Sequence, residues 1–223
     1  MDYKKMSGIA IIVLFIAALG YGGYQAVASQ TKDVKVEAKD SARVKSASKK
    51  KAPKKEAPSP KNVKDDKDMV PLKDFDYNTA SEKKDYPNLA DYPDAFVDVD
   101  IATQRMYIKE GKTILYEMYA STGKKDATPK GTYHVQGERG EFFYTQPLKL
   151  GAYYWVSFLN HGEYLFHTTP TDEQGNYVES IAKTLGREPS SHGCIHLSVP
   201  DCKWVYENVP YGMKVVIHGD FKA

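Results

Sequence analysis

The residues with the most evident chemistry lie in Ser190–His196, near the C-terminal end of the chain, where the sequence reads Ser-Ser-His-Gly-Cys-Ile-His. The Cys194 thiol directly follows a glycine and comes two residues after the His192 imidazole; a further histidine, His167, lies upstream. A cysteine becomes an effective nucleophile near neutral pH when an adjacent base or cation favours its thiolate form. The segment therefore indicates nucleophilic catalysis by Cys194.

Two histidines compete for the role of general base to this thiol. His192 is close in sequence, but closeness in sequence does not aim its ring at the sulfur. His167 ends a predicted strand and can face Cys194 across a sheet. The residue types alone leave the choice open, and each ring can also serve only to order its surroundings. Gly193 lets the backbone approach closely, so that amides near Cys194 can point at a developing oxyanion.

A metal site is the main chemical alternative. His192, Cys194 and His196 alternate in sequence, so an extended strand would place them on one face. Together with His167 they would supply the four ligands of a zinc site. The glycine and the two serines favour a tight loop over a straight strand, and they therefore favour the nucleophile over the metal.

The chain contains only two cysteines, Cys194 and Cys202. A pair of cysteines outside the cytoplasm usually forms a disulfide. Here the two are eight residues apart and Cys202 lies on a predicted helix, so a bridge would need a tight loop and would consume the candidate nucleophile. We therefore expect both thiols to be free, with Cys202 as a small core residue.

The N-terminal residues 1–29 indicate export from the cytoplasm. No charged residue occurs from Ser7 to Ser29, and a membrane span takes about 20 residues. We expect an uncleaved anchor that crosses the membrane with residues 7–28; the alternative is a signal peptide cleaved near Ala28. Both place the rest of the chain outside the cytoplasm, facing the cell wall, where nucleic acid is not an expected partner.

A linker is predicted to follow, over residues 30–85. Its first part, 30–68, contains no aromatic residue, so it cannot bury enough apolar surface to offset its ordering entropy. We expect 69–93 to be an extended lead-in that partly docks on the folded domain. Residues 1–70 hold 15 Lys and Arg against 8 Asp and Glu, whereas the remainder holds 16 against 21. A basic arm of this kind suits anionic lipid or an anionic wall polymer.

The folded domain is predicted over residues 94–220 and is rich in strands. Alternating or β-branched runs recur about every ten residues, which is typical of a β-sandwich or barrel. The expected strands cover 96–101, 104–108, 113–119, 133–136, 153–158, 164–167 and 213–218. Two short helices are expected at 178–185 and 198–208, the second capped by Ser198 with Asp201 at the acidic position of a capping box.

The residues of this domain also resemble those of a known family. The domain from about Asp94 to His218 resembles the catalytic domain of L,D-transpeptidases, the YkuD family, in a membrane-anchored or secreted form of Gram-positive type. The resemblance covers over half of the chain and implies a mainly β fold with two short helices. The matching parts are Ser191–Ile195, the turn Thr128–Tyr133, the upstream His167, and the tail segments Leu197–Asp201 and Val209–Ile217.

The resemblance implies a role for each residue of the site. Cys194 would be the nucleophile and His167 the proton donor and acceptor. Auxiliary positions would be the Thr168 carbonyl, which would steady His167, together with His192, Ser191 and Gly193, the last beside the oxyanion site. No metal and no cofactor are implied.

Two features depart from the family's pattern. Between His167 and Cys194 lie 26 residues, more than the family's usual spacing, and this surplus could form a lid or a wall of a cleft. Position 196 is His where the family commonly has Arg or Asn, so a role carried by that position is in doubt.

The activity implied is that of a peptidoglycan L,D-transpeptidase. Such an enzyme forms a cysteine acyl-enzyme with a stem peptide, releases its terminal D-Ala and makes a 3→3 cross-link to a neighbouring stem. The sequence also leaves open an L,D-carboxypeptidase that acts on the same stem peptides, and a wall-binding module without catalysis.

Overall fold

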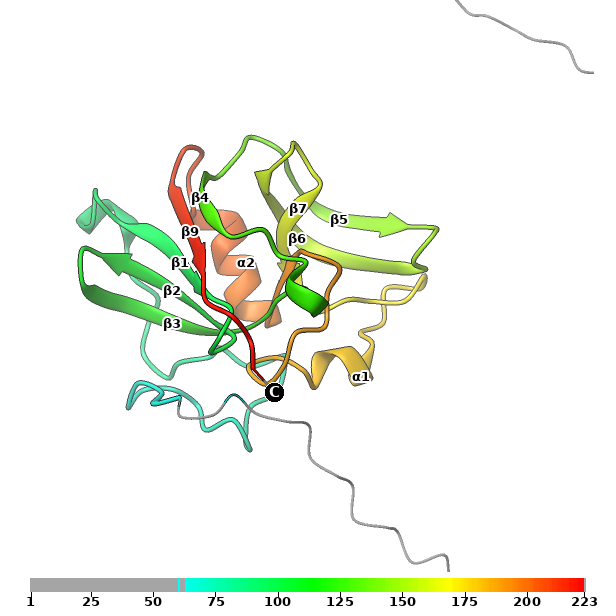
Figure 1. Cartoon of the computed structure of the whole chain (residues 1–223), viewed down its shortest axis with the longest axis horizontal. Coiled ribbons are helices and arrows are strands. Elements are labelled where there is room, and N and C mark those ends of the chain that lie inside the picture. Colours follow the sequence, from blue (N-terminus) through cyan, green and yellow to red (C-terminus); the bar gives the residue numbers. More distant parts are fainter. Residues whose placement is uncertain (1–59, 61–62, 223) are drawn as a thin grey trace, which may run out of the picture. The chain divides into compact units, whose positions relative to one another are not determined.

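The structure is a computed structural model that describes residue 60 and residues 63–222 (Figure 1). The predicted signal or anchor in 1–29 and most of the basic stretch of the predicted linker lie outside the described residues. Within the described part of the chain, no helix combines the length and the apolar character that a membrane crossing requires.

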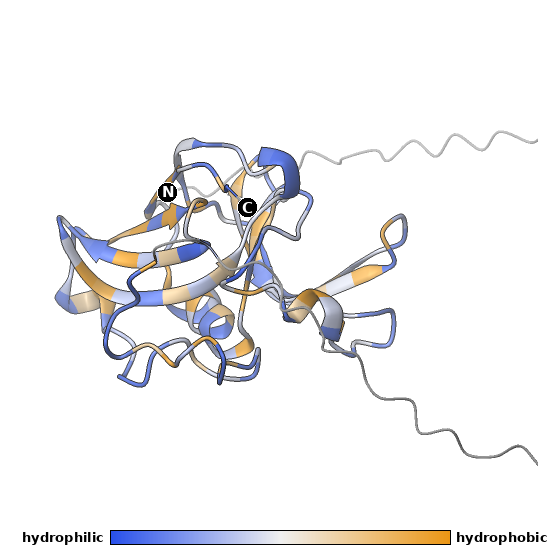
Figure 2. Ribbon diagram, turned by 60° about the horizontal axis from the view of Figure 1, so that its bottom comes forward, coloured by the Kyte–Doolittle hydropathy of each residue, from blue (hydrophilic) through white to orange (hydrophobic). Residues whose placement is uncertain are grey.

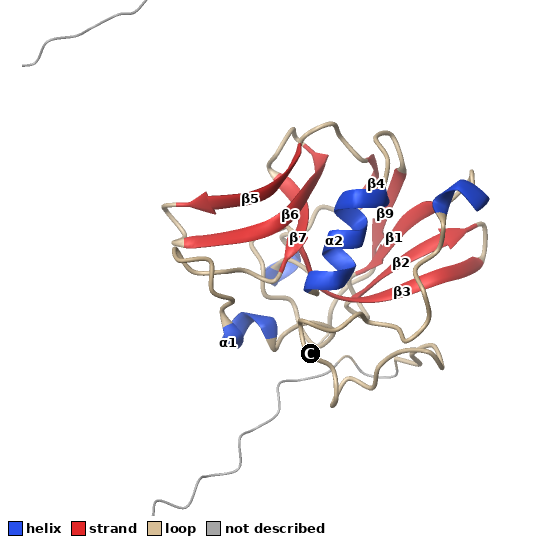
Figure 3. Ribbon diagram, turned by 180° about the vertical axis from the view of Figure 1, so that it is seen from behind, coloured by secondary structure: helices blue, strands red, loops and turns tan. Residues whose placement is uncertain are grey.

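A single mixed sheet organises residues 63–222 and contains nine strands in the order β4-β9-β1-β2-β3-β8-β7-β6-β5. The sheet is strongly curled, and α2 (Val199–Asn208) lies between its two ends and packs on β6 and β7 (Figures 1 and 3). The strands are β1 (Phe96–Asp100), β2 (Arg105–Glu110), β3 (Thr113–Ser121), β4 (Gly131–His134), β5 (Arg139–Thr145), β6 (Leu150–Leu159), β7 (Tyr164–Thr168), β8 (Ile195–Leu197) and β9 (Lys214–His218). The expectation of a mainly β fold with two short helices is confirmed.

The apolar faces of the strands build one core. Figure 2 shows hydrophobic residues alternating with hydrophilic ones along the strands, as half-buried strands require. The predicted hairpin is confirmed: β2 and β3 pair antiparallel around a turn at Gly111. The core side chains come from strands in both halves of the sheet and from α2, and they include Val97, Met106, Tyr116, Phe166 and Val205.

Two strands were not predicted. β5 has mostly half-exposed side chains and no alternation of buried and exposed positions, so it lacks the period of a strand. β8 has only three residues, and the first two, Ile195 and His196, belong to the segment Ser190–His196 that was predicted as a loop. The residues before it, 191–194, do form a tight turn, so the loop prediction holds for Cys194 itself.

The most important pairing for the site joins β7 and β8 in parallel, with His167 directly opposite His196. β8 also pairs antiparallel with the end of β3, where Ser121 faces His196. A parallel pair needs a long connection to return the chain to the same end of the sheet. Residues 169–194 form this connection and contain the short helix α1 (Glu179–Ala182), which lies within the helix predicted at 178–185.

The helix α2 begins as predicted, because the Ser198 side chain accepts a hydrogen bond from the Asp201 amide. The Asp201 carboxylate does not close a capping box. It accepts hydrogen bonds from the Ser81 hydroxyl at 2.5 Å and from the Tyr86 hydroxyl at 2.8 Å. Cys202 is fully buried in the core, as expected, and both cysteines are free thiols.

The predicted linker extends too far towards the C-terminus. Residues 63–85 dock on the sheet: Ser81 and Glu82 are buried, and Asp65 forms an ion pair of 2.6 Å with Arg105, which is itself almost fully buried. The composition of this segment resembles that of the linker, but Asp65 and Ser81 find their partners on β2 and α2. We call residues 63–85 the docking segment; it includes the first part of the lead-in, 69–93, that was expected to dock.

Candidate active site

The Cys194 loop is held by Ser191. The Ser191 hydroxyl accepts a hydrogen bond from the Gly193 amide at 3.0 Å and donates one to the Cys194 carbonyl at 2.5 Å. Gly193 has φ +142°, and a Cβ at this position would lie 2.8 Å from the Tyr164 ring. Only glycine fits both the backbone angle and the close approach. The shape of the turn therefore depends on Ser191 and Gly193.

A neighbouring segment fixes this loop to the sheet. The amides of Ser190 and Ser191 both donate to the Thr122 carbonyl, and the Lys124 amide donates to the Ser191 carbonyl at 3.0 Å. The Thr128 hydroxyl donates to the Gly193 carbonyl at 2.9 Å. The turn Thr128–Tyr133, which contributed to the resemblance, thus begins with a residue that buttresses the loop of the thiol.

The thiol of Cys194 is protonated at neutral pH in this environment. Burial raises its pKa to about 11; the Leu165 amide opposes this shift and the nearby charge of Glu163 adds to it. The sulfur lies 3.8 Å from the Glu163 carbonyl oxygen. A thiol of this kind needs a base that removes its proton as it attacks.

His167 is the buried base candidate. Its Nδ1 lies 2.7 Å from the Thr168 carbonyl oxygen, and a carbonyl only accepts, so Nδ1 carries the proton and Nε2 holds the lone pair. Burial lowers the pKa of His167 to about 4, although the bond to Thr168 opposes the shift. The ring of Phe143 packs against it in an edge-on arrangement. The contact expected between His167 and the Thr168 carbonyl is present.

His196 completes a pair of buried imidazoles that sequence reasoning did not foresee. Its ring centroid lies 4.8 Å from that of His167, and its Nδ1 lies 3.3 Å from the Ser190 hydroxyl. Burial, and then the neighbouring rings of His167 and His192, lower the pKa of His196 well below its ordinary value. The pair follows from the parallel register of β7 and β8. This register is not a local property of the sequence, so the sequence alone could not predict the pair.

His192 takes a different position, because its side chain is exposed whereas His167 and His196 are buried. The four candidate zinc ligands therefore do not share one face of a strand. Over the described residues, no group of three or more His, Cys, Asp and Glu side chains is arranged to hold a metal ion.

One cavity of about 910 Å³ brings the predicted residues together. His167, Ser191, His192, Gly193 and Cys194 all line it, whereas Thr168 lies behind His167 and does not. The wall facing the Cys194 loop is largely apolar and comes from β5, β6 and the α1 region, with the side chains of Phe143, Leu148, Leu150, Trp155 and Ile181.

The long connection between His167 and Cys194 serves as a wall of this cavity. Pro170, Ser180, Ile181, Thr184 and Glu188 line it from this connection. Ser121 ties the connection to β3, because its hydroxyl donates to the Glu188 carbonyl at 2.6 Å. The surplus residues were expected to form a lid or a cleft wall, and they form a cleft wall.

The sequence pattern of the YkuD family, described as the L,D-transpeptidase catalytic domain, matches residues 94–217. The match spans more than half of the chain and contains every strand of the sheet and the whole Cys194 loop, although β9 extends one residue beyond it. The resemblance stated from the sequence is confirmed at the level of the family.

Among curated proteins, the chain is 47% identical over 140 residues to YciB of Bacillus subtilis (strain 168), which is itself assigned only provisionally as an L,D-transpeptidase. The aligned part covers 59% of this chain and 72% of YciB.

Among solved structures, an L,D-transpeptidase from Mycobacterium smegmatis matches with 20% identity and a TM-score of 0.46, over 56% of this chain and 58% of that one. An L,D-transpeptidase (Yku) from Stackebrandtia nassauensis matches with 20% identity and a TM-score of 0.45, over 67% and 63%. The chain thus spans about three fifths of the length of these solved structures.

Proposed function

Because this chain belongs to the YkuD family of L,D-transpeptidases, we propose that it is a cysteine-dependent acyltransferase that forms 3→3 cross-links between peptidoglycan stem peptides. The observation that carries the proposal is the meeting of the Cys194 thiol and the neutral His167 imidazole at one cavity of about 910 Å³. The Thr168 carbonyl fixes the tautomer of His167, so that Nε2 is the nitrogen able to take a proton.

The first half-reaction forms the acyl-enzyme. As the Cys194 sulfur attacks the carbonyl carbon of the third stem residue, its proton passes to His167 Nε2. The C–N bond to the terminal D-Ala then breaks, and His167 returns the proton to the departing amine. A thioester on Cys194 and free D-Ala are the products.

The second half-reaction transfers the acyl group. An amine of a neighbouring stem peptide attacks the thioester and gives its proton to His167, which passes it to the departing sulfur. The new amide is the 3→3 link, and the thiol is restored. Where water takes the place of the amine, the same steps give an L,D-carboxypeptidase.

The oxyanion formed in each half-reaction needs a hydrogen-bond donor. The Gly193 amide already donates to Ser191, so it holds the loop. We therefore assign the oxyanion to the Cys194 amide, with Ser191 as the residue that positions it. His192, which is exposed at the edge of the same cavity, would contact the incoming substrate and would not serve as the base.

The charges of the cavity fit a stem peptide. Lys124 is the only lysine or arginine among the described residues that line it, and two glutamates, Glu163 and Glu188, also line it. A terminal D-Ala presents a carboxylate, which Lys124 would bind, and the acceptor stem presents an amine, which a glutamate would attract.

We extend the proposal to the location of the domain. Residues 7–28 would anchor the chain in the membrane and hold the domain outside the cytoplasm; secretion after cleavage near Ala28 is the alternative. The uncharged run from Ser7 to Ser29 supports this, together with a substrate that lies outside the membrane.

The test exposes the full chain to a carbapenem, whose strained amide imitates the acyl donor, and locates the adduct by mass spectrometry. We expect an adduct on Cys194 that is absent in Cys194→Ser and forms more slowly in His167→Ala. An adduct on Cys202, or none at all, would overturn the mechanism. Incubation with stem tetrapeptide, with and without an acceptor amine, then separates transfer from hydrolysis by its products.

A further inference from the structure

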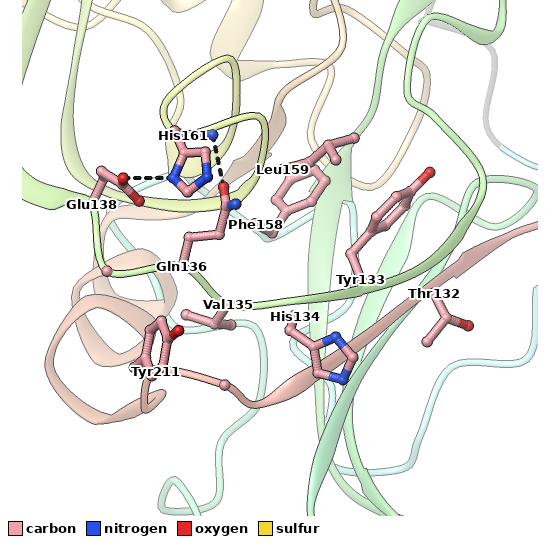
Figure 4. Close-up of a pocket in the computed structure, with 12 residues that line it drawn as sticks. Thr132, Tyr133, His134, Val135, Gln136, Glu138, Phe158, Leu159, His161 and Tyr211 are labelled. Carbon is pink, nitrogen blue, oxygen red and sulfur yellow. Dashed lines mark hydrogen bonds and ion pairs between the residues drawn. The ribbon is translucent and has the colours of Figure 1, made fainter.

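A second cavity, of about 740 Å³, shares no lining residue with the catalytic cavity (Figure 4). Its volume lies within the usual range of small-molecule sites. Three segments line it: Thr132–Glu138, the end of β6 with the following turn, and the turn at Tyr211 and Gly212. None of the residues in these segments takes part in the proposed acyl transfer.

The polar groups of this second cavity are held in fixed positions. Gln136 Oε1 accepts hydrogen bonds from the His161 amide at 2.9 Å and from the Ser157 hydroxyl at 2.8 Å, which leaves the amide nitrogen of Gln136 to donate elsewhere. His161 Nδ1 lies 2.7 Å from Glu138 Oε1 (Figure 4). The other carboxylate oxygen, Glu138 Oε2, is shielded from solvent and accepts no hydrogen bond within the described part of the chain. The Gln136 amide group and the His161 ring are thus held in place before any ligand arrives.

The turn between β6 and β7 determines where the His161 side chain lies. Asn160 and His161 have φ +55° and φ +50° in this turn, a left-handed conformation that Asn and His adopt more readily than most residues. In this conformation His161 Nδ1 lies beside Glu138 Oε1.

The chemistry of the lining matches an uncharged, hydroxylated ligand. Glu138 is the only acidic residue among the lining residues, and His161 is its partner; no lysine or arginine lines the cavity. An anion would be repelled by the carboxylate. Tyr211, which is 77% exposed, presents a free aromatic ring. The apolar C–H face of a sugar ring packs on such an aromatic surface, while its hydroxyl and amide groups bond with side chains such as Gln136 and His161.

A short turn separates the two cavities. His161 lines the second cavity, whereas the next two residues, Gly162 and Glu163, line the catalytic one. The Glu163 carbonyl oxygen lies 3.8 Å from the Cys194 sulfur. A ligand on the His161 side of this turn is therefore a near neighbour of a peptide on the Cys194 side.

We propose that the second cavity binds a saccharide, namely the glycan strand to which the stem peptide of the donor or acceptor is joined. The choice of this saccharide rests on the proposed function, because peptidoglycan supplies an uncharged amino-sugar chain beside the peptide. The site would place the domain along the glycan and so deliver stem peptides to Cys194.

The test titrates the full-length chain, in detergent, with the N-acetylglucosamine tetramer as the probe, by calorimetry. We expect binding with a dissociation constant of about 1 mM or tighter. Tyr211→Ala should weaken it about tenfold through loss of the stacking surface, whereas Tyr211→Phe keeps the ring and should retain it. Phe142→Ala, which removes an exposed aromatic ring that lines neither cavity, is the matched control.

Two results would overturn the proposal: no binding by the unaltered chain, or equal binding by Tyr211→Ala. A free stem peptide that binds to the unaltered chain and is weakened by Tyr211→Ala would also overturn it, because the cavity would then be a peptide site. Cys194→Ala should bind the tetramer as the unaltered chain does. The carbapenem adduct on Cys194 is measured separately, so failure of saccharide binding and failure of the proposed acyl transfer are distinguishable.

Discussion

The imidazole rings of His167 and His196 lie 4.8 Å apart, centroid to centroid, on neighbouring parallel strands. Burial is the first cause that lowers the pKa of each ring, and the charge of one ring would further oppose a charge on the other. Both rings are therefore neutral in the folded protein at neutral pH. The base of the proposed mechanism is consequently ready to accept a proton without prior deprotonation.

The two rings should make the folded protein sensitive to acid. The pKa of each is below the value of about 6.5 for an unfolded histidine, so above pH 6.5 the rings are neutral in both states and contribute no pH dependence. As the pH falls from 6.5 towards 4, the unfolded chain binds protons that the folded chain does not, and stability is lost by up to about 1.4 kcal/mol per pH unit for each ring. His196→Asn should make this loss shallower, as measured by urea unfolding at several pH values.

His134→Asn is the matched control for that series, because it replaces an exposed histidine. Equal slopes for the unaltered chain and for His196→Asn would contradict the assignment of His196 as a neutral buried ring.

The Cys194 thiol should alkylate slowly near neutral pH. With its pKa raised to about 11, only a small fraction is thiolate at pH 7, and that fraction rises about tenfold per pH unit until the pKa is approached. The rate of modification by iodoacetamide should rise accordingly up to about pH 11. Cys202 serves as the internal reference, because it is fully buried and should not react in the folded chain. A rate that levels off near pH 7 would instead indicate a stable thiolate–imidazolium pair.

Gly193→Ala should disable the site while leaving the fold in place. The new Cβ would clash with the Tyr164 ring at 2.8 Å and with the Ala127 carbonyl at 3.1 Å, and φ +142° disfavours a side chain. A shift of the Cys194 loop by about 1 Å should slow carbapenem acylation roughly a hundredfold.

Gly111→Ala is the counterpart, since it places alanine at φ +57° on the β2–β3 turn, where a Cβ meets nothing within 4 Å. It should cost stability without slowing acylation. Unchanged acylation in Gly193→Ala would show that the geometry of the turn does not matter to the chemistry.

Lys124→Met should weaken recognition of the terminal carboxylate. Lys124 is exposed at the edge of the cavity, and an exposed ion pair contributes less than about 1 kcal/mol, so kcat/KM for a stem tetrapeptide should fall about two- to fivefold. Lys125→Met is the matched control, because Lys125 does not line the cavity. With a tetrapeptide whose C-terminus is an amide, the two variants should perform alike; a persistent deficit of Lys124→Met would assign the residue another role.

Asp65→Ala should release the docking segment. Asp65 lies 2.6 Å from the buried Arg105 guanidinium, whereas the second carboxylate beside Arg105, that of Glu117, has its pKa raised to about 7 by burial and is only partly ionised at neutral pH. The loss should be about 1–3 kcal/mol of unfolding free energy, with faster tryptic cleavage at Lys64 and Lys67. Asp68→Ala, in the same segment but without a contact to Arg105, should change neither quantity. Equal protease resistance of the two variants would mean that the segment is held by its other contacts.

The parts of the site that the sequence could predict are the local ones. The turn at Cys194 is formed by consecutive residues of the sequence. The alternation of apolar and polar residues in β1 and the hairpin of β2 and β3 are likewise short-range patterns. The position of His196 beside His167 depends on the pairing of β7 with β8. These strands are far apart in the chain, since 26 residues lie between His167 and Cys194 alone. The sequence of either strand alone does not indicate which distant strand it pairs with.

The extent of the domain could not be predicted for a similar reason. Asp65 stands in a run of charged residues that has the composition of a linker. What fixes it is Arg105, which is buried on β2 and also donates to the Gly186 carbonyl at 2.9 Å, far along the chain. The cavity beside His161 was also missed, since its lining comes from three segments that only the fold brings together.

The parallel pairing of β7 and β8 places His196 opposite His167, whereas the connection between these strands, residues 169–194, supplies a wall of the cavity and also Cys194 itself. Its last part, 190–194, is held by the Thr122 carbonyl and the Thr128 hydroxyl. Its first part, 169–188, lines the cavity with Ile181 and Thr184. We therefore expect that evolution can change the length and sequence of 169–188 with less effect on the position of Cys194 than any change within 190–194 would have.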